Sequence, residues 1–134
     1  MKKAVIAVMV CMSLFLGACK DKMVSTTYTI GCLGYQYSAV NPSSDWQAIQ
    51  DYMSSNVTFN KLVTYENKTV TENDAEASAY FDSQMAKVDT AYVCSLLEEN
   101  DYYVYGIATQ NADGSYRYVK AMKFSENGAV GVSE

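Results

Sequence analysis

Apolar and polar residues alternate along two stretches of this chain, residues 25–39 and 57–66. A period of two with β-branched and aromatic side chains is typical of a strand that has one buried face. Each stretch therefore predicts a strand. The apolar positions on one side are Tyr28, Ile30 and Cys32 in the first stretch and Phe59, Val63 and Tyr65 in the second.

Other stretches have apolar residues at helical spacing. Ser44 and Gln47 form a capping-box pattern, which predicts that a short helix begins there. Asn73 is expected to cap a second, longer helix, because its side chain can accept a hydrogen bond from a free N–H group. Residues 89–97 predict either a third helix capped by Asp89 or a strand, and their good helix formers favour the helix. The expected apolar face of the long helix consists of Ala77, Tyr80, Phe81, Met85 and Val88.

Residues 102–109 and 115–124 alternate again, and the turn Asn111-Ala112-Asp113-Gly114 lies between them. Asp-Gly supplies the positive-φ position that a tight hairpin needs. If Gln110 faces Ser115, one hairpin face is small and aliphatic and suits a closely packed helix, whereas the other face is aromatic. The polar tail after the hairpin is expected to fray.

The elements follow one another as strand, helix, strand, one or two helices, strand and strand. This order predicts an α+β fold, a two-layer sandwich with about four mostly antiparallel strands and two or three helices on one face. The length of 134 residues fits one such domain, and we assign it to residues 25–134.

The start of the chain has the plan of a secretory signal. Lys2 and Lys3 are followed by an apolar run, residues 4–16, that ends in small residues. A retained membrane helix is the alternative, but the run is shorter than the roughly 20 residues that span a bilayer. Residues 1–18 are therefore expected to be removed as a signal peptide.

The sequence Leu16-Gly17-Ala18-Cys19 resembles the lipobox of bacterial prolipoproteins. The resemblance implies that a diacylglyceryl group is attached to the Cys19 thiol and that the chain is cleaved before this residue. Residues 19–24 would then be the lipidated cysteine and a polar tether. Lys20 takes the place of the aspartate that marks inner-membrane retention, so that the outer membrane is favoured, on its periplasmic or its surface-exposed side. The chain as a whole resembles the small lipoproteins of Gram-negative envelopes.

Composition narrows the choice of partners and of chemistry. The net charge is −5, which makes nucleic acid an unsuitable partner. The chain has four cysteines, and one of them, Cys11, leaves with the leader. Cys32 and Cys94 are expected to pair in an oxidising envelope compartment, or else to remain two buried, unpaired thiols.

Catalytic chemistry has little support in the sequence. The chain has no histidine, which removes the ordinary catalytic triads and HExxH zinc sites, and no phosphate-loop motif occurs. We therefore expect no catalytic residue, no cofactor and no metal. Glu98, Glu99 and Asp101 are the one acidic group that could support an alternative, a small envelope hydrolase or inhibitor.

Tyrosine is the residue type that stands out, with twelve copies. Aromatic pairs on a half-buried sheet are the ordinary explanation. A rigid, amphipathic binding face is the functional one. It predicts a non-enzymatic binding module whose partner is an envelope protein or, as second choice, a glycan; a structural subunit of an envelope assembly is a further alternative. The expected binding face consists of Tyr35, Tyr37, Tyr103, Tyr105, Tyr116, Tyr118 and Lys120.

Overall fold

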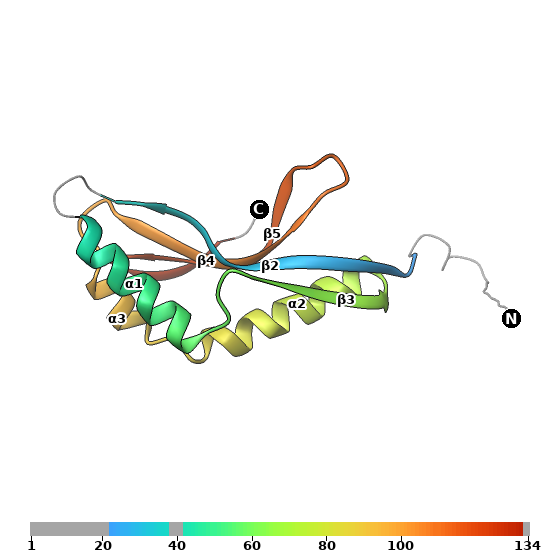
Figure 1. Ribbon diagram of the computed structural model, residues 1–134, viewed down its shortest axis with the longest axis horizontal. Helices are drawn as coiled ribbons and strands as arrows, with labels where there is room; N and C mark the ends of the chain where they lie inside the picture. The colour runs from blue at the N-terminus through green and yellow to red at the C-terminus, as the bar shows by residue number, and fades with distance from the viewer. Residues whose placement is uncertain (1–21, 38–41, 133–134) are drawn as a thin grey trace, which may run out of the picture.

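In a computed structural model, which describes residues 22–37 and 42–132, the chain forms an antiparallel sheet with helices on one of its faces (Figure 1). Within these residues the sheet has five strands in the order β3-β2-β4-β5-β6. The strands are β2 (Val24–Gln36), β3 (Lys61–Lys68), β4 (Tyr102–Gln110), β5 (Tyr116–Ser125) and β6 (Gly128–Val132), and the helices are α1 (Pro42–Asn56), α2 (Val70–Met85) and α3 (Thr90–Ser95). The expected two-layer α+β fold is confirmed.

The sheet has one strand more than expected. Gly128–Val132 was assigned to a frayed tail, but it pairs with β5 as the outermost strand β6. Its sequence, Gly-Ala-Val-Gly-Val, has no polar residue to alternate with the apolar ones. The signal that identified the other strands was therefore missing.

Local capping chemistry sets the helix starts. Helix α1 begins at Pro42, before the predicted cap Ser44, as suits a proline at a first helical position. Helix α2 is capped by Thr69, whose side chain accepts the Glu72 N–H while the Glu72 carboxylate accepts the Thr69 N–H. The predicted cap Asn73 is wrong, because this residue lies inside the helix and its buried amide donates to the carbonyl of Val24.

Hydrogen bonds explain the type of one predicted element, at residues 89–97, and the start of another, strand β3. Asp89 caps α3 by accepting the Tyr92 N–H at 3.1 Å, so that the helix is confirmed and the strand alternative is wrong. Strand β3 begins at Lys61 rather than at residue 57. The N–H of Thr58 donates to Gln84 Oε1 and its carbonyl accepts from the Tyr105 hydroxyl, so its backbone groups are satisfied without a neighbouring strand.

The register of the β4–β5 hairpin differs from the expectation by one residue at the turn. Gln110 faces Tyr116, not Ser115, because the N–H and the hydroxyl of Ser115 both donate to Asp113 within the turn. A bulge between Ile107 and Ala108 shifts the register once more. A shift of one residue exchanges the two faces of a strand. Near the turn the single shift places Tyr118 on the side of Ala108, and beyond the bulge the second shift restores the expected sharing of sides. The aromatic side of β4, with Tyr103 and Tyr105, packs against the helices, where the small aliphatic side was expected.

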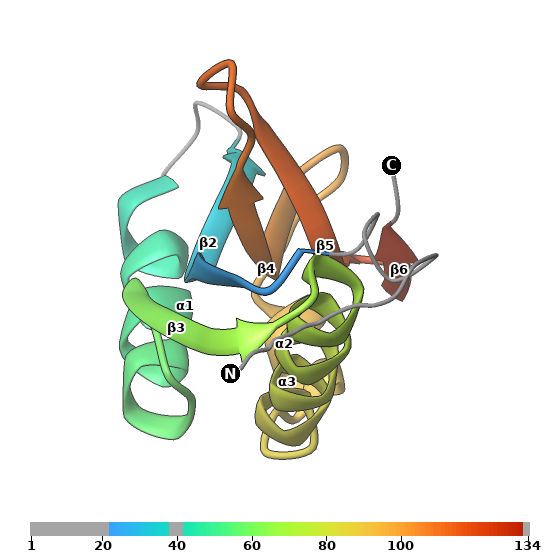
Figure 2. The same cartoon turned by 90° about the vertical axis from the view of Figure 1, so that its right-hand side faces the viewer.

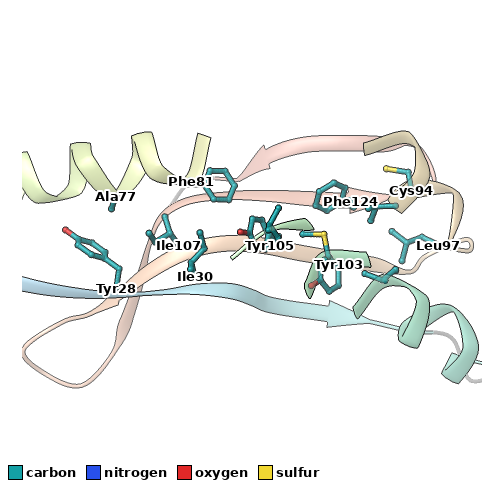
Figure 3. Close-up of a cluster of buried hydrophobic side chains, with 14 residues drawn as sticks. Tyr28, Ile30, Ala77, Phe81, Cys94, Leu97, Tyr103, Tyr105, Ile107 and Phe124 are labelled. Atoms are coloured by element: carbon teal, nitrogen blue, oxygen red, sulfur yellow. The ribbon is translucent and has the colours of Figure 1, made fainter. Parts of the chain in front are cut away.

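The core lies between the sheet and the helix layer (Figure 3). From the sheet, Tyr28, Ile30, Tyr103, Tyr105, Ile107 and Phe124 contribute fully buried side chains. The helices and the segments beside them contribute Ile49, Met53, Ala77, Phe81, Val93 and Leu97. In the part of the chain that the structure describes, no helix is long and apolar enough to cross a membrane.

Candidate functional site: the open face of the sheet

One face of the sheet has no helix over it. All the described helices lie on the other side, and the β4–β5 hairpin projects away from them (Figures 1 and 2). Register defines the residues of this open face, because residues directly opposite one another on neighbouring strands share a side. One row across four strands consists of Leu62, Thr29, Ala108 and Tyr118.

The centre of the open face is covered by two of its own side chains. The position that a Cβ on Gly106 would occupy is 2.8 Å from Leu33 Cδ1, so Leu33 lies directly against β4. Tyr118 reaches across β4, and its hydroxyl is 3.5 Å from the Leu33 carbonyl oxygen. These two residues explain why Ala108 is only 3% exposed without a helix above it.

Two shallow hollows adjoin this covered centre. The first, of about 360 Å³, contains Leu33 and Tyr118, and the second, of about 310 Å³, contains Thr27 and Leu62. Thr29 and Tyr116 line both hollows and so join them. We call this surface the Tyr116 groove and define it by the residues Thr27, Thr29, Leu33, Leu62, Tyr116 and Tyr118.

The groove is uncharged and partly apolar. Tyr116 is 61% exposed and Leu62 is 70% exposed, although both side chains are large and carbon-rich. Hydroxyl groups lie between them, and Thr27 Oγ1 is 2.9 Å from Thr64 Oγ1. An aromatic ring, an aliphatic side chain and hydroxyls together form the kind of surface that binds protein side chains.

An ion pair on the helix side holds the hairpin that carries Tyr116. Arg117 lies one residue further along β5 and its Nη1 is 2.9 Å from Asp74 Oδ2 on α2. The same carboxylate accepts the Tyr28 hydroxyl from β2 at 2.6 Å. Asp74 therefore connects the hairpin, the sheet and α2, and it positions Tyr116 relative to β2.

The predicted tyrosine face is not one surface. Tyr103 and Tyr105 are fully buried in the core, and burial raises the pKa of both hydroxyls. Their assignment to an exposed binding face is wrong, because this side of β4 packs against the helix layer, where the Tyr105 ring stacks on Phe81 of α2. The hydroxyl of Tyr105 donates to the Thr58 carbonyl at 2.7 Å, which is a structural role.

The remaining predicted residues divide between the two faces. Tyr35 and Tyr37 both contact Trp46 of α1, with ring centroids 4.2 and 5.3 Å away, and so belong to the helix side. Lys120 also lies on that side, where its Nζ is 2.7 Å from Asp82 Oδ1. Of the seven residues predicted for this face, the structure places only the tyrosines at positions 116 and 118 on the open face.

Sequence reasoning missed the aliphatic part of the groove. Leu62 is the neighbour of Val63 on β3, and alternation alone already placed the two on opposite sides of that strand. Leu33 gave no such signal, because a bulge between Cys32 and Gly34 interrupts the alternation of β2.

Cys32 and Cys94, for which a bridge was the expectation, are both unpaired thiols in the structure; Cys94 is buried and Cys32 is partly buried. Cys32 lies on β2 opposite Tyr105, and burial raises the pKa of its thiol. Cys94 lies on α3, which packs against β5 and β6. The two cysteines therefore belong to different parts of the sandwich.

The acidic residues do not converge. Glu98 and Glu99 are exposed, whereas Asp101 is 3% exposed and its N–H donates to the Glu98 carbonyl in a turn. Among the described residues no group of three or more Asp, Glu, Cys or His side chains is placed to hold a metal ion.

The Tyr116 groove is thus the surface on which the described residues bring exposed aromatic, aliphatic and hydroxyl groups together. The lipobox and Cys19 lie outside the described residues. Comparisons of the chain with protein-family models, with curated proteins and with solved structures gave no match.

Proposed function

We propose that this chain is a lipid-anchored protein of the bacterial cell envelope that acts non-enzymatically, as a binding module for another envelope protein. The observation that carries the proposal is the Tyr116 groove. Its two most exposed large side chains, Tyr116 and Leu62, are 61% and 70% exposed and lie beside the hollows of the open face. Exposed apolar side chains that gather on one surface are typical of an interaction site.

The chemistry of the groove supports a protein partner. Tyrosine offers a large contact area and a hydroxyl with little loss of conformational entropy on binding. The groove has no charged side chain among the residues that define it, in a chain whose net charge is −5. A neutral, partly apolar segment of a protein suits this surface better than a polyanion does.

The anchor follows from the lipobox resemblance. Two or more acyl chains on Cys19 would hold the protein at a membrane, because a single chain binds only marginally. The outer membrane is the favoured location, with the domain on its periplasmic or surface-exposed side. Strand β2 starts at Val24, close in sequence to the proposed anchor Cys19, so the partner is expected at the same membrane.

The anchor can be tested by metabolic labelling. Cells that express the full chain are grown with a clickable fatty acid, and the intact mass of the purified protein is measured. We expect label on the wild-type protein, loss of residues 1–18 from its mass, and no label on Cys19→Ala. A wild-type protein without label, or one that keeps residues 1–18, would contradict the anchor.

The groove can be tested by affinity purification of the full-length protein from solubilised envelopes, with the recovered envelope protein identified by mass spectrometry. Replacing a central interface residue typically costs about 2 kcal/mol of binding free energy or more. We therefore expect Tyr116→Ser to reduce recovery of that protein by about tenfold or more.

Tyr92→Ser is the matched control, because Tyr92 is also exposed (42%) but lies on α3, in the helix layer. We expect this variant to recover the partner as the wild type does. Circular dichroism of both variants should match the wild type. Equal recovery by the two variants would show that the groove does not bind the partner.

A further inference from the structure

The two edges of the sheet differ in how they are protected. Natural edge strands carry charged residues, prolines or bulges, which prevent unwanted pairing with another strand. Strand β3, one edge, has Lys61, Glu66 and Lys68 in its sequence and an irregular register opposite Val24. Its Asn67 also has a positive φ of 63°. This edge is protected in the usual way.

Strand β6, the other edge, has none of these devices. Within the described residues it pairs on one side only, with β5, and its sequence contains neither a charged residue nor proline. Val130 is 61% exposed. The outer side of β6 therefore offers a row of backbone N–H and C=O groups to an added strand.

An open hollow of about 510 Å³ lies next to this edge on the helix side. We call it the Phe81 hollow; its apolar lining includes Phe81, Met85, Val119, Met122, Gly131 and Val132. The ion pair of Lys120 and Asp82 also lines it. Gly131 faces Met122 across the β5–β6 pair, and a Cβ on Gly131 would meet nothing within 4 Å. A side chain from a strand added beside Gly131 thus has room to enter the hollow.

The residues of β6 make a second copy of this chain a poor partner for this edge and for the Phe81 hollow. In a symmetric β6–β6 pair, the partner copy would present to the helix side only the residues that β6 itself has there, Ala129 and Gly131. Glycine and alanine are too small to cover the apolar lining of a hollow of this size. A foreign strand with large apolar residues at alternate positions would fill it.

We propose that the outer edge of β6 binds an extended segment of another protein, which adds a strand to the sheet and places large apolar side chains in the Phe81 hollow. The main-chain hydrogen bonds supply affinity, and the alternate side chains supply specificity. This site is separate from the Tyr116 groove, which lies across β2, β3 and β5 on the open face.

The test uses the full-length protein in mild detergent and a phage-displayed library of peptides about eight residues long, the typical upper length of a strand. The library is first depleted on the variant Gly131→Lys and is then selected on the wild-type protein. The added lysine fits the fold, because its Cβ has open space, and it blocks the hollow and the edge. We expect the selected peptides to have large apolar residues at alternate positions.

The best peptide is then synthesised with a fluorophore, and its binding is measured by fluorescence anisotropy. We expect Gly131→Lys to weaken binding by about tenfold or more. The matched control is Gly34→Lys on β2, which makes the same charge change at another glycine with open space around it. A distant surface substitution should change the affinity by about twofold at most.

Several results would overturn the proposal. They are a selection that yields no peptide, selected peptides without the alternating pattern, and equal weakening by Gly131→Lys and Gly34→Lys. A dimer of the wild-type protein in sedimentation experiments that Gly131→Lys alone abolishes would assign the edge to a second copy instead.

Discussion

Replacing Tyr103 by alanine should lower the free energy of unfolding by about 3–5 kcal/mol, the range for large aromatic residues in a core. Tyr103 is fully buried, and its ring lies 5.7 Å from Trp46 and 6.3 Å from Phe124. Removing it would leave a cavity between β4 and α1. Guanidinium unfolding can be followed by the fluorescence of Trp46, the one tryptophan of the chain.

Tyr116→Ala is the control for this prediction. It makes the same chemical change at a tyrosine that is 61% exposed, so the expected loss of stability is only about 0.5 kcal/mol or less. The difference between the two variants measures which face of the hairpin packs against the helices. A larger loss for Tyr116→Ala than for Tyr103→Ala would mean that Tyr116, and not Tyr103, packs against the helices.

Raising the pH from 8 to 11 should remove about 4 kcal/mol of stability through three buried tyrosines. Burial raises the pKa of Tyr28, Tyr103 and Tyr105 above the ordinary value of about 10 that they have in the unfolded chain. Below about pH 9 both states are neutral at these residues, and their contribution is fully present. Above it the unfolded chain loses protons that the folded chain keeps, so each tyrosine removes about 1.4 kcal/mol by pH 11.

Guanidinium unfolding between pH 8 and pH 11 would measure this loss. Absorbance at 295 nm should show that the three buried residues ionise only when the protein unfolds. The variant Tyr105→Phe should lose about 1.4 kcal/mol less stability between pH 8 and pH 11 than the wild type, whatever it does to stability at neutral pH. An unchanged dependence in that variant would contradict the assignment of Tyr105 to the core.

The fold class could be predicted because its signals are local. Alternation identified β2, β4 and β5, and Asp89 capped α3 through a bond to a residue three positions away. The start of α2 was also within reach, since Thr69 and Glu72 form a complete capping box in the sequence. Asn73 was preferred in error, because its burial against β2 is visible only in the folded chain.

The binding surface could not be predicted, because it depends on strand register. A turn bond at Ser115 and a bulge beside Ile107 together decide which residues of β5 share a side with Tyr105, and they place Tyr118 on the opposite side, with Ala108. Neither changes the composition of the strand. From the sequence, either the aromatic or the small aliphatic side of the hairpin could pack against the helices, and the expected side was the wrong one.

The sequence by itself determined which segments become strands and helices, since hydrogen bonds and side-chain spacing within a few residues suffice for that. It is also the sole basis for the expected anchor at Cys19. Only the tertiary structure decided that Tyr103 and Tyr105 are core residues, that Leu33 and Tyr118 cover the open face, and that β6 completes the sheet. The physical reason is that burial is a property of contacts between distant strands, and one residue of register is enough to exchange core and surface.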